Sequence, residues 1–340
     1  MKVDAGGKNG MAKFKVFVTR QLPGKGLERL KPIADVDVNP EDRVLTREEL
    51  LKGVRGKDGV ISLLNDKMDG EAMDASKKLR IISNYAVGFD NVDLKAATDR
   101  GIYVTNTPEV LTESVADLAL ALMLGVARRL NEADQFLRQG KWEGWAPMLL
   151  LGNDVYNKTL GIVGLGRIGA CVAKRAKGFN MRLVYFDAVR NEKLEKELGI
   201  TYVSFANLLK QSDFISIHVP LLPSTHHMFG EKEFKLMKPT AYIVNTSRGP
   251  VVDEKALAEA LKKGIIAGAG LDVFEKEPVD KDNPLLKLGN TVLLPHVASG
   301  TIETRTAMAD LAVENLMNVL QGKMPSSLVN KEVVKVKPLQ

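Results

Sequence analysis

The sequence predicts an α/β protein built from two doubly wound parallel-sheet domains, and three observations lead to this fold class. The chain of 340 residues is too long for one compact core, so two domains are the expected organisation. From Lys13 onward, short β-branched runs alternate with amphipathic stretches, which is the pattern of parallel strands covered by helices. The alternation falls into two series, and a glycine-rich turn follows the first strand of the second series.

The first series contains about five expected strands, each a short apolar run. They are expected at residues 13–19, 34–38, 58–64, 79–85 and 102–107. A helix is expected after the second strand, where Thr46 is a candidate N-cap and Glu49 stands three residues later. This spacing predicts a capping box, in which each side chain binds the backbone N–H of the other residue.

The second series contains about seven expected strands. They are expected at residues 159–164, 182–187, 201–204, 213–219, 241–246, 268–274 and 291–295. Between the two series, residues 111–140 are apolar at three- and four-residue spacing and free of proline, which predicts one long helix. Thr112 or Ser114 would lie near its start, and Gly140 would follow its end. A last helix at residues 302–322 could return to the first domain and make that domain discontinuous.

Composition argues against several classes of partner. The net charge of +6 comes from 48 basic and 42 acidic residues that are interleaved along the expected helices, so no nucleic-acid partner is expected. The longest apolar run, residues 118–127, is far shorter than the roughly 20 residues of a membrane span, so no membrane association is expected. Cys171 is the only cysteine and no secretory segment opens the chain, which favours the cytoplasm. Residues 1–10 are small and polar and are expected to form a poorly ordered extension.

The glycine-rich turn has the spacing of a dinucleotide-binding fingerprint set between a strand and a helix. It reads Gly164-Leu165-Gly166-Arg167-Ile168-Gly169. Gly164 would permit the tight turn, Gly166 the approach of a pyrophosphate, and Gly169 the close packing of helix on strand. The helix N-terminus would then offer N–H groups and a partial positive charge to the phosphates.

Asp187 ends the next expected strand, 18 residues beyond Gly169, and this offset matches that of the carboxylate that binds the adenosine ribose. A carboxylate at this point would repel a 2′-phosphate, so NAD is the expected cofactor. Arg190 lies close enough in the sequence to work against this preference.

A nicotinamide-dependent dehydrogenase acting on a keto acid needs a proton donor near the carbonyl, a cation for the carboxylate, and often a carboxylate beside the donor. The sequence holds four histidines. His226 and His227 fall in a polar loop, whereas His218 and His296 each follow an apolar strand, where ligands bind in open α/β sheets. Periodicity alone does not choose between the last two.

Five ordered motifs make that choice: GIVGLGRIG, HVPL, NTSRGPVVDE, AGLDVFEKEP and LLPHVASG. With them the chain resembles the D-isomer-specific 2-hydroxyacid dehydrogenase family from Phe14 to Asn330, and it most resembles the glyoxylate and hydroxypyruvate reductases within it. The resemblance implies a homodimer that uses NAD to reduce a small 2-keto acid to the D-2-hydroxy acid. It also implies a flavodoxin-like substrate domain at residues 12–107 and 298–332. A Rossmann cofactor domain at residues 108–297, including the long helix as a dimerisation element, would be inserted in it.

Position by position, the family's catalytic residues correspond to Arg248 of NTSRG, Glu277 of FEKEP and His296 of PHVAS. The resemblance implies that Arg248 binds the substrate carboxylate and polarises the keto oxygen with its rigid fork of donors. His296 would donate a proton to that oxygen, and Glu277 would orient the ring and favour its charged form. No metal is expected in the site.

The resemblance assigns further residues to the cofactor and the substrate. Contacts to the cofactor are expected from His218, Thr246, Ser247 and Asp272, the last near the carboxamide. Backbone N–H groups of Val87 and Gly88 are expected to hold the substrate carboxylate together with Arg248. Trp145 is expected to reach across the dimer toward the partner's site.

Three other functions stay open at this point. A 2-ketogluconate or other sugar-acid reductase would use the same scaffold for a longer substrate, and the sequence does not separate it from the leading hypothesis. A corepressor that responds to NAD would need peptide-binding clefts and long extensions, which the sequence does not suggest. Phosphite oxidation is disfavoured because residues 86–89 resemble the substrate loop of the keto-acid reductases.

Overall fold

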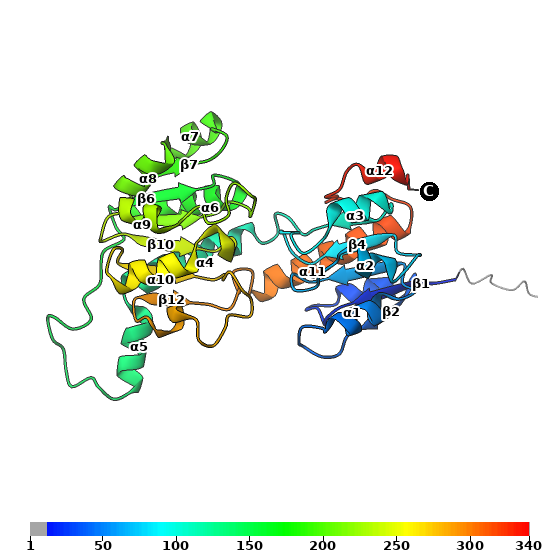
Figure 1. Ribbon diagram of the computed structural model, residues 1–340, viewed down its shortest axis with the longest axis horizontal. Coiled ribbons are helices and arrows are strands. Elements are labelled where there is room, and N and C mark those ends of the chain that lie inside the picture. The colour runs from blue at the N-terminus through cyan, green and yellow to red at the C-terminus, as the bar shows by residue number, and fades with distance from the viewer. Residues whose placement is uncertain (1–11, 340) are drawn as a thin grey trace, which may run out of the picture. The chain divides into compact units, whose positions relative to one another are not determined.

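The computed structural model describes residues 12–339 and divides the chain into two units (Figure 1). The first unit contains residues 12–110 and 301–339, and the second contains Leu111–Gly300. Each unit is built on one fully parallel sheet, so the predicted fold class is confirmed. The extension expected at residues 1–10 lies outside the described residues. No helix within residues 12–339 is long and apolar enough to span a membrane.

The sheet of the first unit has five strands in the order β2-β1-β3-β4-β5, as many as the sequence predicts. The strands are β1 (Phe14–Val18), β2 (Ala34–Val38), β3 (Gly59–Ser62), β4 (Ile81–Asn84) and β5 (Tyr103–Thr105). The helices are η1 (Gly26–Leu30), α1 (Arg47–Val54), α2 (Gly70–Asp74), α3 (Leu94–Asp99), α11 (Ile302–Leu320) and α12 (Val333–Val336). The last long helix, α11, returns to this sheet, where Ser83 Oγ of β4 donates to the carbonyl of Ala312 at 2.8 Å.

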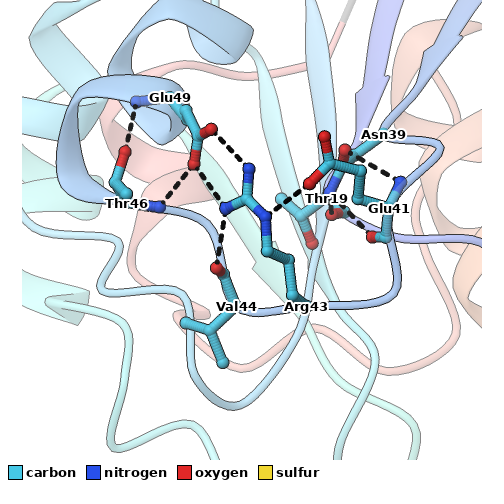
Figure 2. A network of polar contacts seen from close by, with 7 residues as sticks. All are labelled: Thr19, Asn39, Glu41, Arg43, Val44, Thr46 and Glu49. Carbon is cyan, nitrogen blue, oxygen red and sulfur yellow. Dashed lines mark hydrogen bonds and ion pairs between the residues drawn. The ribbon is translucent and has the colours of Figure 1, made fainter.

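The loop between β2 and α1 is fixed by side chains at both of its ends (Figure 2). Thr46 and Glu49 form the predicted capping box, since the Glu49 N–H donates to Thr46 Oγ1 at 3.3 Å and the Thr46 N–H to Glu49 Oε2 at 2.8 Å. Arg43 donates to both oxygens of Glu49 and, with the Thr46 N–H, lowers the pKa of Glu49 to about 2. Asn39 Nδ2 donates to the carbonyl of Thr19 at 3.1 Å, which ties the loop to the carboxyl end of β1.

The sheet of the second unit has seven strands in the order β12-β11-β10-β9-β6-β7-β8, again as many as predicted. The strands are β6 (Thr159–Val163), β7 (Arg182–Phe186), β8 (Thr201–Tyr202), β9 (Phe214–Ile217), β10 (Tyr242–Asn245), β11 (Gly268–Leu271) and β12 (Thr291–Leu293). The helices around it include α6 (Arg167–Ala176), α7 (Glu192–Leu198), α8 (Phe205–Gln211), α9 (Glu231–Leu236), η3 (Gly249–Val251) and α10 (Glu254–Lys262). The strand order reverses between β6 and β9, and ligands of such sheets bind at the carboxyl ends beside this switch point.

The prediction of one long helix over residues 111–140 is wrong. The segment forms two helices, α4 (Thr112–Ala127) and α5 (Leu130–Arg138), which are separated at Arg129. Arg129 has a φ of +53°, in the left-handed region, and its guanidinium binds both Glu132 oxygens at 2.6 and 3.0 Å. The apolar periodicity runs through this break, so the sequence pattern does not reveal it. Helix α4 is largely buried, whereas α5 has no buried residue and projects from the second unit (Figure 1).

Candidate active site

The expected site residues of the second unit follow the carboxyl ends of its strands. Because these strands are all parallel, the residues that follow them gather at one edge of the sheet. Gly164 follows β6, Asp187 follows β7, His218 follows β9, and Asp272 follows β11. Thr246, Ser247 and Arg248 follow β10, and His296 comes three residues after the end of β12.

The glycine-rich turn fits a dinucleotide by its own geometry. Gly164 has a φ of +96°, and a Cβ there would lie 2.8 Å from the backbone of His218. A Cβ on Gly169 would overlap the carbonyl of Gly164, whereas a Cβ on Gly166 would meet no atom within 4 Å. Within residues 12–339 no side chain caps the start of α6, so its first turn presents backbone N–H groups beside that open space.

Asp187 is held beside this turn by a backbone hydrogen bond. The Leu165 N–H donates to Asp187 Oδ2 at 2.7 Å, and the Val189 N–H lies 3.4 Å from Oδ1. A carboxylate oxygen can accept more than one hydrogen bond, so Asp187 keeps acceptor capacity for a ribose hydroxyl. The expected ribose ligand therefore stands next to the expected pyrophosphate turn.

Asn245, which the sequence analysis missed, organises the residues after β10. Its Oδ1 accepts the Ser247 N–H at 2.9 Å and the Ser247 hydroxyl at 2.8 Å, and its Nδ2 donates to the Arg248 carbonyl at 2.9 Å. An asparagine that directly precedes a turn often bonds the following backbone, which is the signal that would have found it. The buried Thr246 Oγ1 has no partner among the described residues, and a buried hydroxyl of this kind fits a ligand-facing position.

Gly249 fixes the distance between the Arg248 segment and the loop that carries Glu277. A Cβ on Gly249 would overlap the backbone of Phe274, so the two segments pack this closely only with glycine at this point. Phe274 in turn donates its N–H to Glu277 Oε1 at 3.1 Å. The glycine of NTSRG is therefore a packing requirement of the site.

His296 and Glu277 form a direct pair. His296 Nδ1 lies 2.7 Å from Glu277 Oε2, and the two side chains are 30% and 29% exposed. Burial by itself would raise the pKa of Glu277, but the hydrogen bond and charge of His296, the Phe274 N–H and the charge of Arg248 outweigh it and lower the pKa. An ionised carboxylate only accepts hydrogen bonds, so Nδ1 carries the proton of this bond and Nε2 is left for a ligand.

Asp272 holds the loop that carries His296. Its backbone carbonyl accepts the His296 N–H at 2.8 Å, and its two carboxylate oxygens accept the N–H groups of Val297 and Ala298 at 2.7 and 2.8 Å. The side chain is fully buried, and burial raises its pKa although the two N–H groups oppose this. From the family resemblance, this carboxylate is expected near the carboxamide of the cofactor. In the structure both of its oxygens bind the loop that carries His296.

His218 has a different environment from His296. Its Nε2 lies 2.8 Å from Ser216 Oγ, and desolvation of the ring lowers its pKa to about 3. An imidazole with such a pKa is neutral at physiological pH and has no extra proton to give. His226 and His227 stack at 4.0 Å in a loop, and His227 Nε2 lies 3.0 Å from Glu275.

The expected substrate loop belongs to the first unit and follows β4. Asn106 Nδ2 donates to the Val87 carbonyl at 2.8 Å, and Asn84 Nδ2 donates to the Gly88 carbonyl at 2.9 Å. The N–H groups of Val87 and Gly88 make no hydrogen bond within the part of the chain that the structure describes. Tying down the carbonyls leaves those N–H groups for an anion. The two asparagines were not identified from the sequence.

Two further expectations concern Trp145 and metals. Trp145 is 84% exposed in the loop after α5. No group of three or more histidine, cysteine or acidic side chains suited to a metal ion occurs among residues 12–339.

The chain is similar to known proteins of one enzyme family. The family model "D-isomer specific 2-hydroxyacid dehydrogenase, NAD binding domain" matches residues 120–298. A glyoxylate reductase of Korarchaeum cryptofilum is 55% identical over 327 residues, which cover 96% of this chain and 98% of that one. Similar solved structures include the following two. One is a protein of Thermus thermophilus with a TM-score of 0.89, 47% identity and coverage of 93% and 99%. The other is an NADPH-dependent glyoxylate/hydroxypyruvate reductase of Sinorhizobium meliloti with a TM-score of 0.82, 36% identity and coverage of 95% and 98%.

The chain belongs to the D-isomer-specific 2-hydroxyacid dehydrogenase family, as its motifs predicted. It is therefore an oxidoreductase that uses a nicotinamide dinucleotide. The family's glyoxylate reductases, represented by the Korarchaeum enzyme, are relatives over almost the whole chain.

The contacts of Asp272 predict the effect of Asp272→Asn. The amide retains one acceptor but turns an NH₂ toward the second backbone N–H, and leaving a buried donor unpaired costs about 1–3 kcal/mol. The loop at His296 should shift, and turnover should fall about tenfold or more while ADP-ribose still binds. Asp213→Asn is the matched control, since Asp213 accepts the Thr159 N–H and Lys238 Nζ at the opposite edge of the sheet. Normal turnover by Asp272→Asn would contradict the role given to this loop.

Proposed function

We propose that this protein reduces glyoxylate and hydroxypyruvate to the corresponding 2-hydroxy acids, with NADH as the preferred reductant, in the cytoplasm. The observation that carries the proposal is the His296–Glu277 pair at 2.7 Å, on the sheet edge that also bears Arg248 and the dinucleotide turn. The identity of 55% to a glyoxylate reductase supports the choice of substrate. Steady-state rates with glyoxylate, hydroxypyruvate, pyruvate and 2-ketogluconate test it, and clear preference for 2-ketogluconate would contradict it.

Each residue of the site has a chemical task in this reaction. When bound, NADH supplies a hydride to the carbonyl carbon of the substrate. Arg248 binds the substrate carboxylate and polarises the keto oxygen, and the N–H groups of Val87 and Gly88 share the carboxylate. His296 gives the proton on Nε2 to the oxygen and keeps the proton on Nδ1, which stays bonded to Glu277. The ionised Glu277 stabilises the imidazolium before the transfer and the correct ring orientation throughout.

The preference for NADH rests on Asp187. Its carboxylate stands beside the glycine turn, held by the Leu165 N–H, where the ribose hydroxyls of a dinucleotide bind. A negative charge there disfavours a 2′-phosphate. Since the related Sinorhizobium enzyme is NADPH-dependent, the family scaffold supports both cofactors, and the choice is made locally.

We further propose that the protein is a homodimer joined through α5 and the loop that follows it. This segment exposes six large apolar side chains between 56% and 84%: Leu130, Leu137, Trp142, Trp145, Met148 and Leu151. So many exposed apolar side chains in one segment are unfavourable in water, and they favour burial of the segment against a second copy. Trp145, the most exposed of them, would then reach toward the partner's site.

The role of His296 predicts that His296→Ala loses most of its turnover and keeps its affinity for NADH. General acid catalysis typically contributes on the order of 10² to 10⁴-fold, so turnover with glyoxylate should fall within that range while NADH binding persists. His218→Ala should act mainly on the affinity for NADH, because a neutral imidazole with so low a pKa supplies no proton. Near-normal turnover by His296→Ala, measured by NADH oxidation, would sink the assignment.

Glu277→Gln should change the pH dependence of the reaction. The lowered pKa of Glu277 keeps its carboxylate ionised over the working range, and that charge favours the protonated His296 ring. Without the charge, a smaller fraction of the ring is protonated at any given pH. The alkaline limb of the kcat profile for keto-acid reduction should therefore move to lower pH. An unmoved alkaline limb would mean that Glu277 does not tune the proton donor.

The proposed interface predicts the mass in solution. Light scattering at micromolar concentration should give twice the chain mass for the wild type. Leu137→Glu should shift the protein toward the monomer, since it places a charge in the buried interface. Met324→Glu changes a side chain that is similarly exposed but lies outside this segment, so the mass should stay that of the dimer. A monomeric wild type would remove both the dimer and the cross-subunit role of Trp145.

A further inference from the structure

The loop between β7 and α7 carries an arginine whose position bears on the choice between NADH and NADPH. We propose that Glu195 is a second determinant of cofactor selectivity, because it binds Arg190 and withholds this guanidinium from a 2′-phosphate. The inference rests on the proposed preference for NADH and deepens it. Asp187 would repel the phosphate, and Glu195 would remove the nearby cation that could compensate for the repulsion.

Arg190 and Glu195 form a two-point pair. Arg190 Nε donates to Glu195 Oε1 and Nη2 donates to Oε2, both at 2.8 Å. This fork-to-fork geometry fixes the guanidinium plane as well as its distance. The Glu192 carboxylate adds a weaker attraction at 3.8 Å from Nη1, and the guanidinium carbon lies 5.9 Å from the centre of the Tyr202 ring.

Glu195 is itself held in place from β7. The Tyr185 hydroxyl donates to Glu195 Oε1 at 2.8 Å and accepts the Asn191 N–H at 2.8 Å. The Glu195 side chain is 15% exposed, compared with 55% for Arg190. Glu195 is therefore the more firmly held member of the pair. The hydrogen bonds from Arg190 and Tyr185 lower the pKa of Glu195 to about 2, and the group is ionised at every working pH.

An arginine after the second strand of a Rossmann sheet is able to bind the 2′-phosphate of NADP. Arg190 stands three residues beyond Asp187, on the same loop, and is of the right type and charge. An exposed ion pair alone would open easily for a phosphate dianion. Here the guanidinium would have to leave a bidentate acceptor that Tyr185 also binds, so the pair competes with the phosphate.

The test is a double-mutant cycle read by direct binding. Calorimetry with ADP-ribose and 2′-phospho-ADP-ribose, at constant ionic strength, would compare the wild type, Glu195→Gln, Arg190→Ala and the double variant. Glu195→Gln should lower the Kd for 2′-phospho-ADP-ribose on the order of tenfold, a gain of about 1.4 kcal/mol, and leave that for ADP-ribose nearly unchanged. Arg190→Ala should have little effect in the wild type but cancel the gain in Glu195→Gln.

Glu197→Gln is the matched control. It removes the same charge from the same helix, but Glu197 lies 3.5 Å from Lys174 and makes no ion pair with Arg190. It should leave the Kd for 2′-phospho-ADP-ribose nearly unchanged. If thermal melting shows that Glu195→Gln does not fold, Glu195→Asp keeps the charge, shortens the reach and should give a smaller gain.

Three results would overturn the inference. One is an unchanged Kd for 2′-phospho-ADP-ribose in Glu195→Gln, and another is an equal gain in Glu197→Gln. The third is that Arg190→Ala weakens the binding of 2′-phospho-ADP-ribose equally in the wild type and in Glu195→Gln. Arg190 of the wild type would then already contact the phosphate. Failure of the proposed NADH preference is seen separately, as a wild type that binds 2′-phospho-ADP-ribose as tightly as ADP-ribose.

Discussion

The hydrogen bond between His296 Nδ1 and the ionised Glu277 is the interaction on which the rest of the site depends. It fixes the tautomer and the ring orientation of one imidazole at the same time. The backbone around it is arranged at a cost, since His296 has a φ of +55°, and such a conformation costs of order 1–3 kcal/mol. Three hydrogen bonds from His296, Val297 and Ala298 to Asp272 offset that cost.

The second unit supplies the rigid frame for this pair. Its carboxyl edge collects residues that are distant in sequence, and close backbone packing at Gly164, Gly169 and Gly249 sets the spacing between the turns. Each of these glycines is required by a neighbouring backbone and not by the ligand itself. Backbone packing at the glycines therefore sets the spacing of the turns, and side-chain hydrogen bonds from Asn245, Asp272 and Glu277 fix the groups that these turns carry.

Much of this fold could be predicted because buried parallel strands appear as short apolar runs in the sequence. The number of strands in both sheets and the capping box at Thr46 follow from such local patterns. The break at Arg129 does not, because it depends on one left-handed residue and an ion pair to Glu132. Nothing in the apolar periodicity marks that residue.

The residues of the site also differ in whether a local sequence pattern predicts them. The dinucleotide turn and Asp187 have a fixed local spacing, so a strand, three glycines and an acid were enough to nominate them. Periodicity did not separate His218 from His296, and only the family motifs favoured His296; the structure adds the 2.7 Å bond to Glu277 and the lowered pKa of His218. The asparagines at positions 84, 106 and 245 act on backbone groups, and a single polar residue after a strand gives little signal.

The most direct test of the account is a crystal structure of the protein with NADH and oxamate, an unreactive analogue of glyoxylate. His296 Nε2 should lie within about 2.6–3.2 Å of the oxamate carbonyl oxygen, with Nδ1 still bonded to Glu277. The oxamate carboxylate should contact Arg248 and the N–H groups of Val87 and Gly88. A carbonyl oxygen bound by His218, or by no histidine, would contradict the central claim.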